Sequence, residues 1–195
     1  MEYIKVNKKK IFLNNHILYL DHLDINHISD IKSLQKFSNL QGLYLERNNI
    51  TTIEKLNRLV NLRKLHLESN YLQEINGLDA LINLEELDLG GNQISKIEHL
   101  DHQKNLKELL LNNNKIRKVE NLENLENLQN LDLSNNNIQN VEGLERLKNL
   151  KHLNLSNNQI RSIDNFADLT NLETLNLTGN PLLSSIHLKN VRILT

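Results

Sequence analysis

Residues 62–72 of this 195-residue chain read Leu62-Arg-Lys-Leu65-His-Leu67-Glu-Ser-Asn70-Tyr-Leu72. The same arrangement of leucines and one asparagine begins every 22 residues without interruption, at Leu40, Leu62, Leu84, Leu106, Leu128, Leu150 and Leu172. A fixed period of this length predicts a stack of similar units that share one continuous core. Each unit is expected to contact its two neighbours and little else.

Each unit is predicted to contain one short strand followed by a turn. Successive side chains of a strand alternate between faces, so Leu65 and Leu67 lie on one face and His66 on the other. Asn70 follows where the chain turns away from the sheet, and a buried amide there both donates to and accepts from unpaired backbone groups. The equivalent asparagines form a predicted ladder of Asn48, Asn70, Asn92, Asn114, Asn136, Asn158 and Asn180.

The segments between strands carry apolar residues at every third position, as in Ile53, Leu56 and Leu59. A spacing of three is typical of 3₁₀ turns, in which residues i and i+3 eclipse. The pattern therefore predicts an α/β solenoid with a parallel sheet on one side and short 3₁₀ segments on the other. Gln103 replaces the expected apolar residue in one unit, which indicates a local weak point or a place where something packs from outside.

The ends of the chain differ from the middle. We expect residues 1–17 to form an N-terminal cap, as a β-hairpin around Lys8–Lys10, with an unstructured tail as the alternative. Residues 18–39 form a degenerate first repeat, in which Asp21 occupies a column that is otherwise leucine. Residues 40–181 hold the regular repeats, and 182–195 a partial terminal repeat whose edge at Val191–Thr195 is predicted to lie open or to meet a partner.

Composition excludes several classes of protein. The net charge is −1, so no overall field attracts nucleic acid or an anionic membrane surface. The chain has no cysteine, which excludes disulfides, thiolate metal sites and thioester-forming catalysis. Residues 1–15 lack the uninterrupted apolar stretch of a signal peptide or membrane span. We therefore predict a cytoplasmic protein that binds neither nucleic acid nor membrane.

These motifs resemble the leucine-rich repeat family, in the 22-residue subclass represented by the regulatory subunit of protein phosphatase 1 and the bacterial internalins. The similarity extends from Leu18 to Leu194. It implies a right-handed horseshoe with the parallel sheet on its concave side. It also implies that a protein binds on that side, usually without catalysis. A phosphatase is the partner that the family suggests, beside a small GTPase or a cytoskeletal protein.

The N-terminal half of the concave face is the predicted protein-binding site. Tyr44, His66 and Leu110 place apolar or amphipathic groups where solvent is expected, whereas the strands from Asp132 onward carry small polar residues. An aromatic residue ringed by charges is typical of a binding hot spot. The alternative is a set of isolated surface residues. The predicted binding residues are Tyr44, Glu46, Lys64, His66, Glu68, Glu86, Asp88, Glu108 and Leu110.

Catalysis is not predicted. His66, Glu68 and Asp88 are expected to lie near one another across adjacent strands, as in a metal site or an acid–base pair. An open sheet leaves such side chains in water and forms no pocket for a substrate. We therefore expect no catalytic residue, no cofactor and no metal site.

The function that follows is a non-catalytic interaction module with a scaffold or regulatory role. It is predicted to be a monomer that holds another protein on its concave face. The alternative is a structural protein that self-assembles, or dimerises, through its C-terminal strand edge, because an exposed strand edge is a template for pairing.

Overall fold

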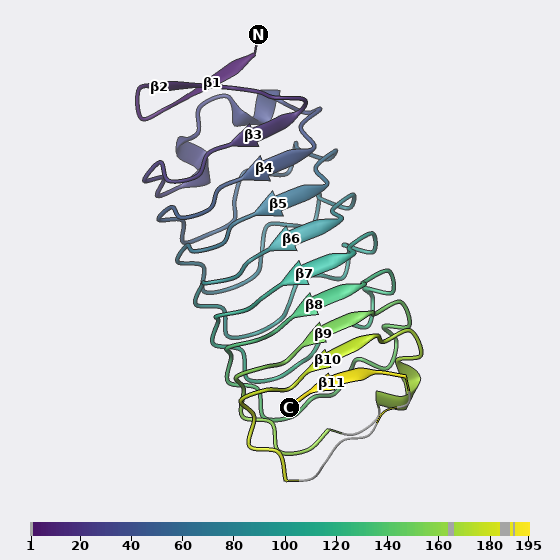
Figure 1. Ribbon diagram of the computed structural model, residues 1–195. Coiled ribbons are helices and arrows are strands. Elements are labelled where there is room, and N and C mark those ends of the chain that lie inside the picture. Colours follow the sequence, from purple (N-terminus) through teal and green to yellow (C-terminus); the bar gives the residue numbers. More distant parts are fainter. Residues whose placement is uncertain (1, 164–165, 184–187, 189) are drawn as a thin grey trace.

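The computed structural model describes residues 2–163, 166–183, 188 and 190–195. Within these residues, nine three-residue parallel strands form one sheet in which every strand pairs with its neighbour in sequence (Figure 1). The strands are β3 (Ile17–Tyr19), β4 (Gly42–Tyr44), β5 (Lys64–His66), β6 (Glu86–Asp88), β7 (Glu108–Leu110), β8 (Asn130–Asp132), β9 (His152–Asn154), β10 (Thr174–Asn176) and β11 (Arg192–Leu194). The terminal repeat expected over 182–195 lies partly outside the described residues.

The middle residue of each regular strand is a leucine that points into the core. Leu43, Leu65 and Leu87 pair in register, and the column continues through Leu175 with at most 2 % of each side chain exposed. The first and third residues of each strand therefore face the other side of the sheet. This arrangement confirms the predicted parallel sheet and its leucine columns.

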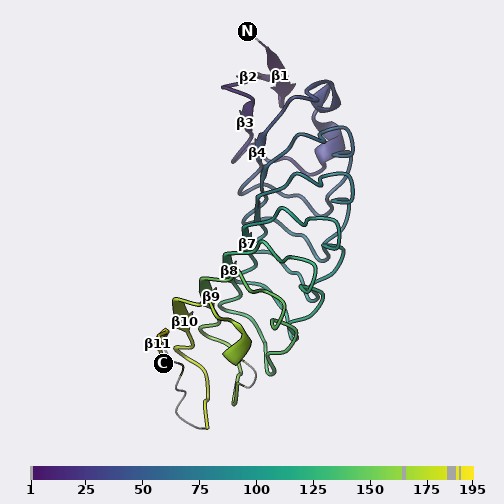
Figure 2. The same ribbon diagram turned by 90° about the vertical axis from the view of Figure 1, so that its right-hand side faces the viewer.

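The stack bends, and its strands gather along the inner side of the bend (Figure 2). In the part of the chain that the structure describes, the outer side consists of turns and three short 3₁₀ helices, η1 (Ile28–Asp30), η2 (Leu34–Lys36) and η3 (Phe166–Asp168). The turns use i→i+3 backbone hydrogen bonds, as from Leu59 N to Leu56 O at 2.8 Å and from Leu62 N to Leu59 O at 2.9 Å. The three-residue apolar spacing thus corresponds to 3₁₀ geometry, and the solenoid prediction is confirmed.

A β-hairpin covers the N-terminal end of the stack (Figure 1). Strands β1 (Tyr3–Val6) and β2 (Lys9–Phe12) pair antiparallel, and the turn between them holds Asn7 and Lys8 at φ values of 46° and 66°. Ile4 and Val6 are buried against the first repeat. The hairpin therefore shields the apolar end of the core from water.

The first repeat is longer than the others. Leu18 pairs with Leu43, which lies 25 positions later, whereas the displacement is 22 for each strand pair from β4–β5 to β9–β10. The last pair differs again, because Leu175 of β10 pairs with Ile193 of β11, 18 positions later. Leu18 and Leu20 therefore occupy the leucine columns, and the alignment that placed Asp21 there is wrong by three residues. The extra residues are accommodated in a run of i→i+3 turns through η1 and η2. Asp21 instead accepts a hydrogen bond from Glu46 N at 2.8 Å.

Gln103 lies inside the convex wall, completely buried. Its Nε2 donates to Leu78 O at 2.9 Å, but Oε1 has no partner among the described residues. Leu78 O also accepts from Leu81 N, so the glutamine is not needed to satisfy that carbonyl. A buried amide oxygen without a donor costs free energy, which favours the interpretation of Gln103 as a local weak point.

Buried asparagines link each unit to the one before it. Asn92 Nδ2 donates to Leu67 O in the preceding unit and to Leu89 O in its own, each at 3.0 Å. Asn92 Oδ1 accepts from Leu72 N at 2.9 Å. The same bonds recur along the predicted ladder, at Asn48, Asn70, Asn114, Asn136, Asn158 and Asn180. Each amide therefore satisfies backbone groups that water does not reach.

We predict that Asn92→Ala lowers the free energy of unfolding by roughly 2–3 kcal/mol, because it leaves Leu72 N without an acceptor in the core. Urea denaturation measures the loss. The control is Asn83→Ala, at an exposed asparagine whose side chain makes a single bond, to Val60 O. The control should cost less than about 1 kcal/mol, and equal losses in the two variants would contradict this role of the ladder.

Candidate functional site

The concave face displays the first and third residues of each strand. It also displays the residue that lies two positions beyond the end of the strand. The structure places all nine predicted binding residues on this face. Lys64, Glu86 and Glu108 are first residues of β5–β7, and the third residues Tyr44, His66, Asp88 and Leu110 pair in succession across β4–β7. Glu46 and Glu68 follow β4 and β5. Four consecutive strands therefore carry the predicted set.

Three aromatic rings stack along the N-terminal part of this face. The ring centroids of Tyr19 and Tyr44 are 4.7 Å apart at an interplanar angle of 28°, and those of Tyr44 and His66 are 4.5 Å apart at 37°. Tyr19 is 48 % exposed. Burial raises the pKa of Tyr44, so its phenol is neutral and available as a hydrogen-bond donor.

Tyr19 was missed by the sequence analysis. The alignment of the first repeat at a spacing of 22 residues placed Tyr19 outside the column of Tyr44. In the structure Tyr19 pairs directly with Tyr44 across β3 and β4. The signal that identifies it is the Leu18-Tyr19-Leu20 triplet, which matches Leu43-Tyr44-Leu45 once the first repeat is allowed three more residues.

Charged side chains surround the aromatic stack. Lys64 Nζ lies 2.7 Å from Glu86 Oε1, and this hydrogen bond raises the pKa of Lys64. His66 lies between two carboxylates, with Nδ1 3.5 Å from Glu46 Oε1 and Nε2 3.8 Å from Glu86 Oε2. Neither distance is that of a close hydrogen bond, and the buried Nε2 of His66 has no hydrogen-bond partner among the described residues.

Asp88 is the one predicted residue that is nearly enclosed, with 9 % of its surface exposed. Its Oδ1 accepts a hydrogen bond from Gly90 N at 2.9 Å. Burial raises the pKa of Asp88, and the charges of Glu68 and Glu46 raise it further, while Gly90 and His66 act in the opposite direction. The neighbouring side chain on β7 is Leu110, which has no polar group to offer.

Leu110 faces a different part of the surface from Tyr44, because two strands separate them. It borders a groove of about 480 Å³ that extends over β7–β11, with Asp132, Asn154 and Asn176 along it and Leu194 at its far end. The small polar residues that seemed to be background in the sequence thus leave a hollow. Arg192 and Leu194 of β11 also line the groove. Both belong to the edge at Val191–Thr195 that was predicted to lie open or to meet a partner, but not to the predicted binding residues of the concave face.

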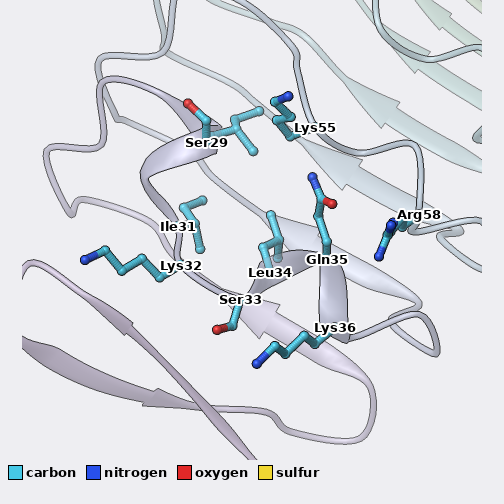
Figure 3. Close-up of a pocket in the computed structure, with 10 residues that line it drawn as sticks. Ser29, Ile31, Lys32, Ser33, Leu34, Gln35, Lys36, Lys55 and Arg58 are labelled. Atoms are coloured by element: carbon cyan, nitrogen blue, oxygen red, sulfur yellow. The ribbon is translucent and has the colours of Figure 1, made fainter.

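A second hollow of similar size lies outside the concave face, beside η1 and η2. It is lined by Ile31 and Leu34 and rimmed by the cations Lys32, Lys36, Lys55 and Arg58. The charged ends of these side chains point in different directions and do not converge on one point (Figure 3). This hollow therefore has no arrangement that would hold a single anion.

Two features are absent from the described residues. No group of three or more His, Asp or Glu side chains there is arranged to hold a metal ion. No helix in the same part of the chain has the length and apolar character needed to cross a bilayer.

Comparisons with known proteins agree with this architecture. The family model described as two copies of leucine-rich repeats matches residues 60–102 and 104–146, and a second, described as leucine rich repeat, matches residues 126–182. The solved structure of internalin C2 from Listeria monocytogenes is 30 % identical with a TM-score of 0.84, covering 92 % of this chain and 80 % of that one. No curated protein matches the sequence.

Two other solved structures are similar over part of their length. An internalin F from Listeria monocytogenes is 26 % identical with a TM-score of 0.70, and a leucine-rich repeat protein from Leptospira interrogans is 27 % identical with a TM-score of 0.57. Each comparison covers 85 % of this chain but 54 % and 55 % of the other, so the chain spans about half of those proteins. Leucine-rich repeat proteins generally mediate protein–protein interactions and are generally non-catalytic. The family models match repeats between residues 60 and 182, and the fold matches that of internalin C2 at 30 % identity. This chain therefore belongs to the leucine-rich repeat family.

Proposed function

We propose that this chain is a non-catalytic interaction module that holds a partner protein on the concave face of β3–β7. The observation that carries this proposal is the stack of Tyr19, Tyr44 and His66, which presents aromatic surface to solvent beside Glu46, Glu86 and Lys64. Aromatic side chains provide large contact areas at low entropic cost, and surrounding charges form the polar rim that interfaces typically show.

The sheet supports binding because it is already ordered. Every strand is hydrogen-bonded to its neighbours, and the chain beyond each strand is tied to the next unit, as by the bond from Leu67 N to Asp88 O at 2.8 Å. The backbone of this face therefore loses little conformational freedom when a partner docks. A preorganised surface of this kind retains more of its contact energy as affinity.

Asp88 adds a second argument, because a neutral side chain could accept the turn hydrogen bond that its carboxylate accepts from Gly90 N. Asn154 and Asn176, at the same place in later units, accept the same turn hydrogen bond from residue i+2 without a charge. A carboxylate that is buried and faces two further carboxylates is unfavourable for folding at neutral pH. Residues that cost stability in this way are typical of functional surfaces.

A scaffold or regulatory role and a cytoplasmic location belong to this proposal. A phosphatase and a small GTPase are both compatible with the chemistry of the concave face. We therefore describe the partner by the groups that its own surface must present to this face. It should present aromatic or aliphatic groups opposite Tyr44, with positive charge around them.

Self-assembly is the second candidate function. Strand β11 pairs with β10 on one side and with no other strand among the described residues, and Leu194 on it is 39 % exposed. Light scattering separates the two candidates. The interaction module is expected to show the mass of one chain at all concentrations, whereas a mass that rises with concentration would favour assembly through this edge.

Replacing Tyr44 and Leu110 tests the binding surface. We expect the double variant Tyr44→Ala with Leu110→Glu to abolish affinity capture of the partner from native lysate, because it removes an aromatic anchor and adds charge beside Asp88. The matched control is Tyr71→Ala, which removes an exposed tyrosine that lies outside the sheet. Both variants should unfold at nearly the wild-type temperature. Undiminished capture by the double variant would place the site elsewhere.

Asp88→Asn tests whether the buried carboxylate lowers the free energy of unfolding. The raised pKa means that folding favours protonated Asp88, so its contribution to stability falls as pH rises from the ordinary aspartate pKa through the folded-state pKa. We expect the variant to unfold at a higher urea concentration than wild type at pH 7. The difference in unfolding urea concentration between variant and wild type should become smaller as pH falls toward about 4, where unfolded aspartate also becomes protonated. A variant that is less stable at pH 7 would contradict this assignment.

A further inference from the structure

One turn of the convex wall contains an asparagine that is followed directly by a glycine, Asn76-Gly77. No other asparagine in the sequence is followed by glycine. At the place of Asn76, four other units have a glutamate, namely Glu54, Glu98, Glu120 and Glu142. The turn therefore does not require an asparagine, and this unit differs from the others in its chemistry.

The shape of the turn requires the glycine. Gly77 has a φ of 66°, in the left-handed region that glycine adopts without steric cost. A Cβ at this position would lie 2.3 Å from the backbone oxygen of Ile53 in the preceding unit. Because glycine carries no side chain, its amide nitrogen is the least hindered that can follow an asparagine.

The groups that would react are open to water in the folded chain. Gly77 is exposed, and its N–H donates to no acceptor among the described residues. Asn76 Nδ2 donates to Glu74 Oε1 in an exposed hydrogen bond, whereas Asn76 Oδ1 is buried and has no hydrogen-bond partner in the described part of the chain. No bond to the glycine nitrogen therefore has to break before that nitrogen attacks the amide.

We infer that Asn76 is a site of spontaneous deamidation in the folded protein. Gly77 N loses its proton to hydroxide and attacks Asn76 Cγ, which forms a cyclic succinimide. The bond from Cγ to Nδ2 breaks, and Nδ2 takes a proton from water and leaves as ammonia. The co-reactant is water alone. The inference is independent of the proposed function, because Asn76 lies outside the concave strands.

Water then opens the succinimide in one of two ways. Attack at Cγ breaks the bond from Cγ to Gly77 N and leaves aspartate with an unchanged backbone. Attack at the backbone carbonyl carbon of Asn76 breaks the original peptide bond and leaves isoaspartate, in which the chain runs through Cβ and Cγ.

Both products weaken the convex wall at this unit. Ile75 and Leu78, on either side of the site, are completely buried and follow the three-residue spacing of the turns. Isoaspartate adds a backbone atom between them, so they cannot both keep their places in the core. Aspartate leaves that spacing intact but places a carboxylate beside Glu74, and like charges repel.

Incubation of the full folded chain tests the inference. The protein is kept at neutral and at mildly alkaline pH and then digested for peptide mass spectrometry, with fragmentation that distinguishes aspartate from isoaspartate. We expect Asn76 to be converted to both products, and faster at the alkaline pH because Gly77 N must lose its proton.

Asn83 in the same unit is the internal control. It is also exposed, but the next amide, Leu84 N, donates to Leu81 O at 3.2 Å. Conversion of Asn76 should be at least about tenfold faster, because the bond from Leu84 must break first and the leucine side chain hinders attack. Equal rates at the two asparagines, or a rate at Asn76 that does not rise with pH, would overturn the inference.

Two variants complete the test. Asn76→Gln should keep its urea midpoint during incubation while that of wild type falls, because glutamine forms the corresponding ring much more slowly. Glu142→Asn places an asparagine before Gly143, which also has a positive φ, of 75°, but whose N–H donates to Glu145 Oε1 at 3.4 Å. This variant should gain a second, slower site. Conversion at residue 142 with Asn76 intact, or conversion of Asn76 only after unfolding in urea, would show that the fold protects Asn76 and that the inference is wrong.

Discussion

The structure depends on how a narrow coil satisfies its buried backbone groups. Each unit is too thin to enclose a core, so its leucines are shielded only when the next unit covers them. The turn beyond each strand leaves amide groups facing this apolar interior, and a single buried asparagine such as Asn92 pairs with them from two units at once. Apolar packing and the asparagine hydrogen bonds thus act at the same contact between successive units, and together they keep neighbouring strands in register.

Register in turn determines what the concave face presents. Because equivalent residues of neighbouring strands lie side by side, any departure from the small polar background becomes part of a continuous patch. Tyr19, Tyr44 and His66 stack for this reason, and the charges beside them gather in columns. The site therefore needs no loop or lid, and its chemistry follows from which residues occupy consecutive strands.

Sequence reasoning predicted the elements that depend on the period alone. The leucine columns, the asparagine ladder and the 3₁₀ turns all follow from spacing, and so does the presence of Tyr44, His66 and Asp88 on one face. Tyr19 was not predicted, because the first repeat is longer and its pairing depends on how the convex turns accommodate the extra residues. The burial of Asp88 also escaped prediction, since it depends on side-chain packing with residues of the adjacent strands.

Cross-saturation NMR of the complex tests most directly whether the partner contacts the concave strands. Saturating the partner's protons should reduce the amide signals of Tyr19, Tyr44, His66 and Asp88, with little change in the convex turns. Signal loss centred on the convex turns, or on Arg192–Leu194 at the sheet edge, would contradict the account.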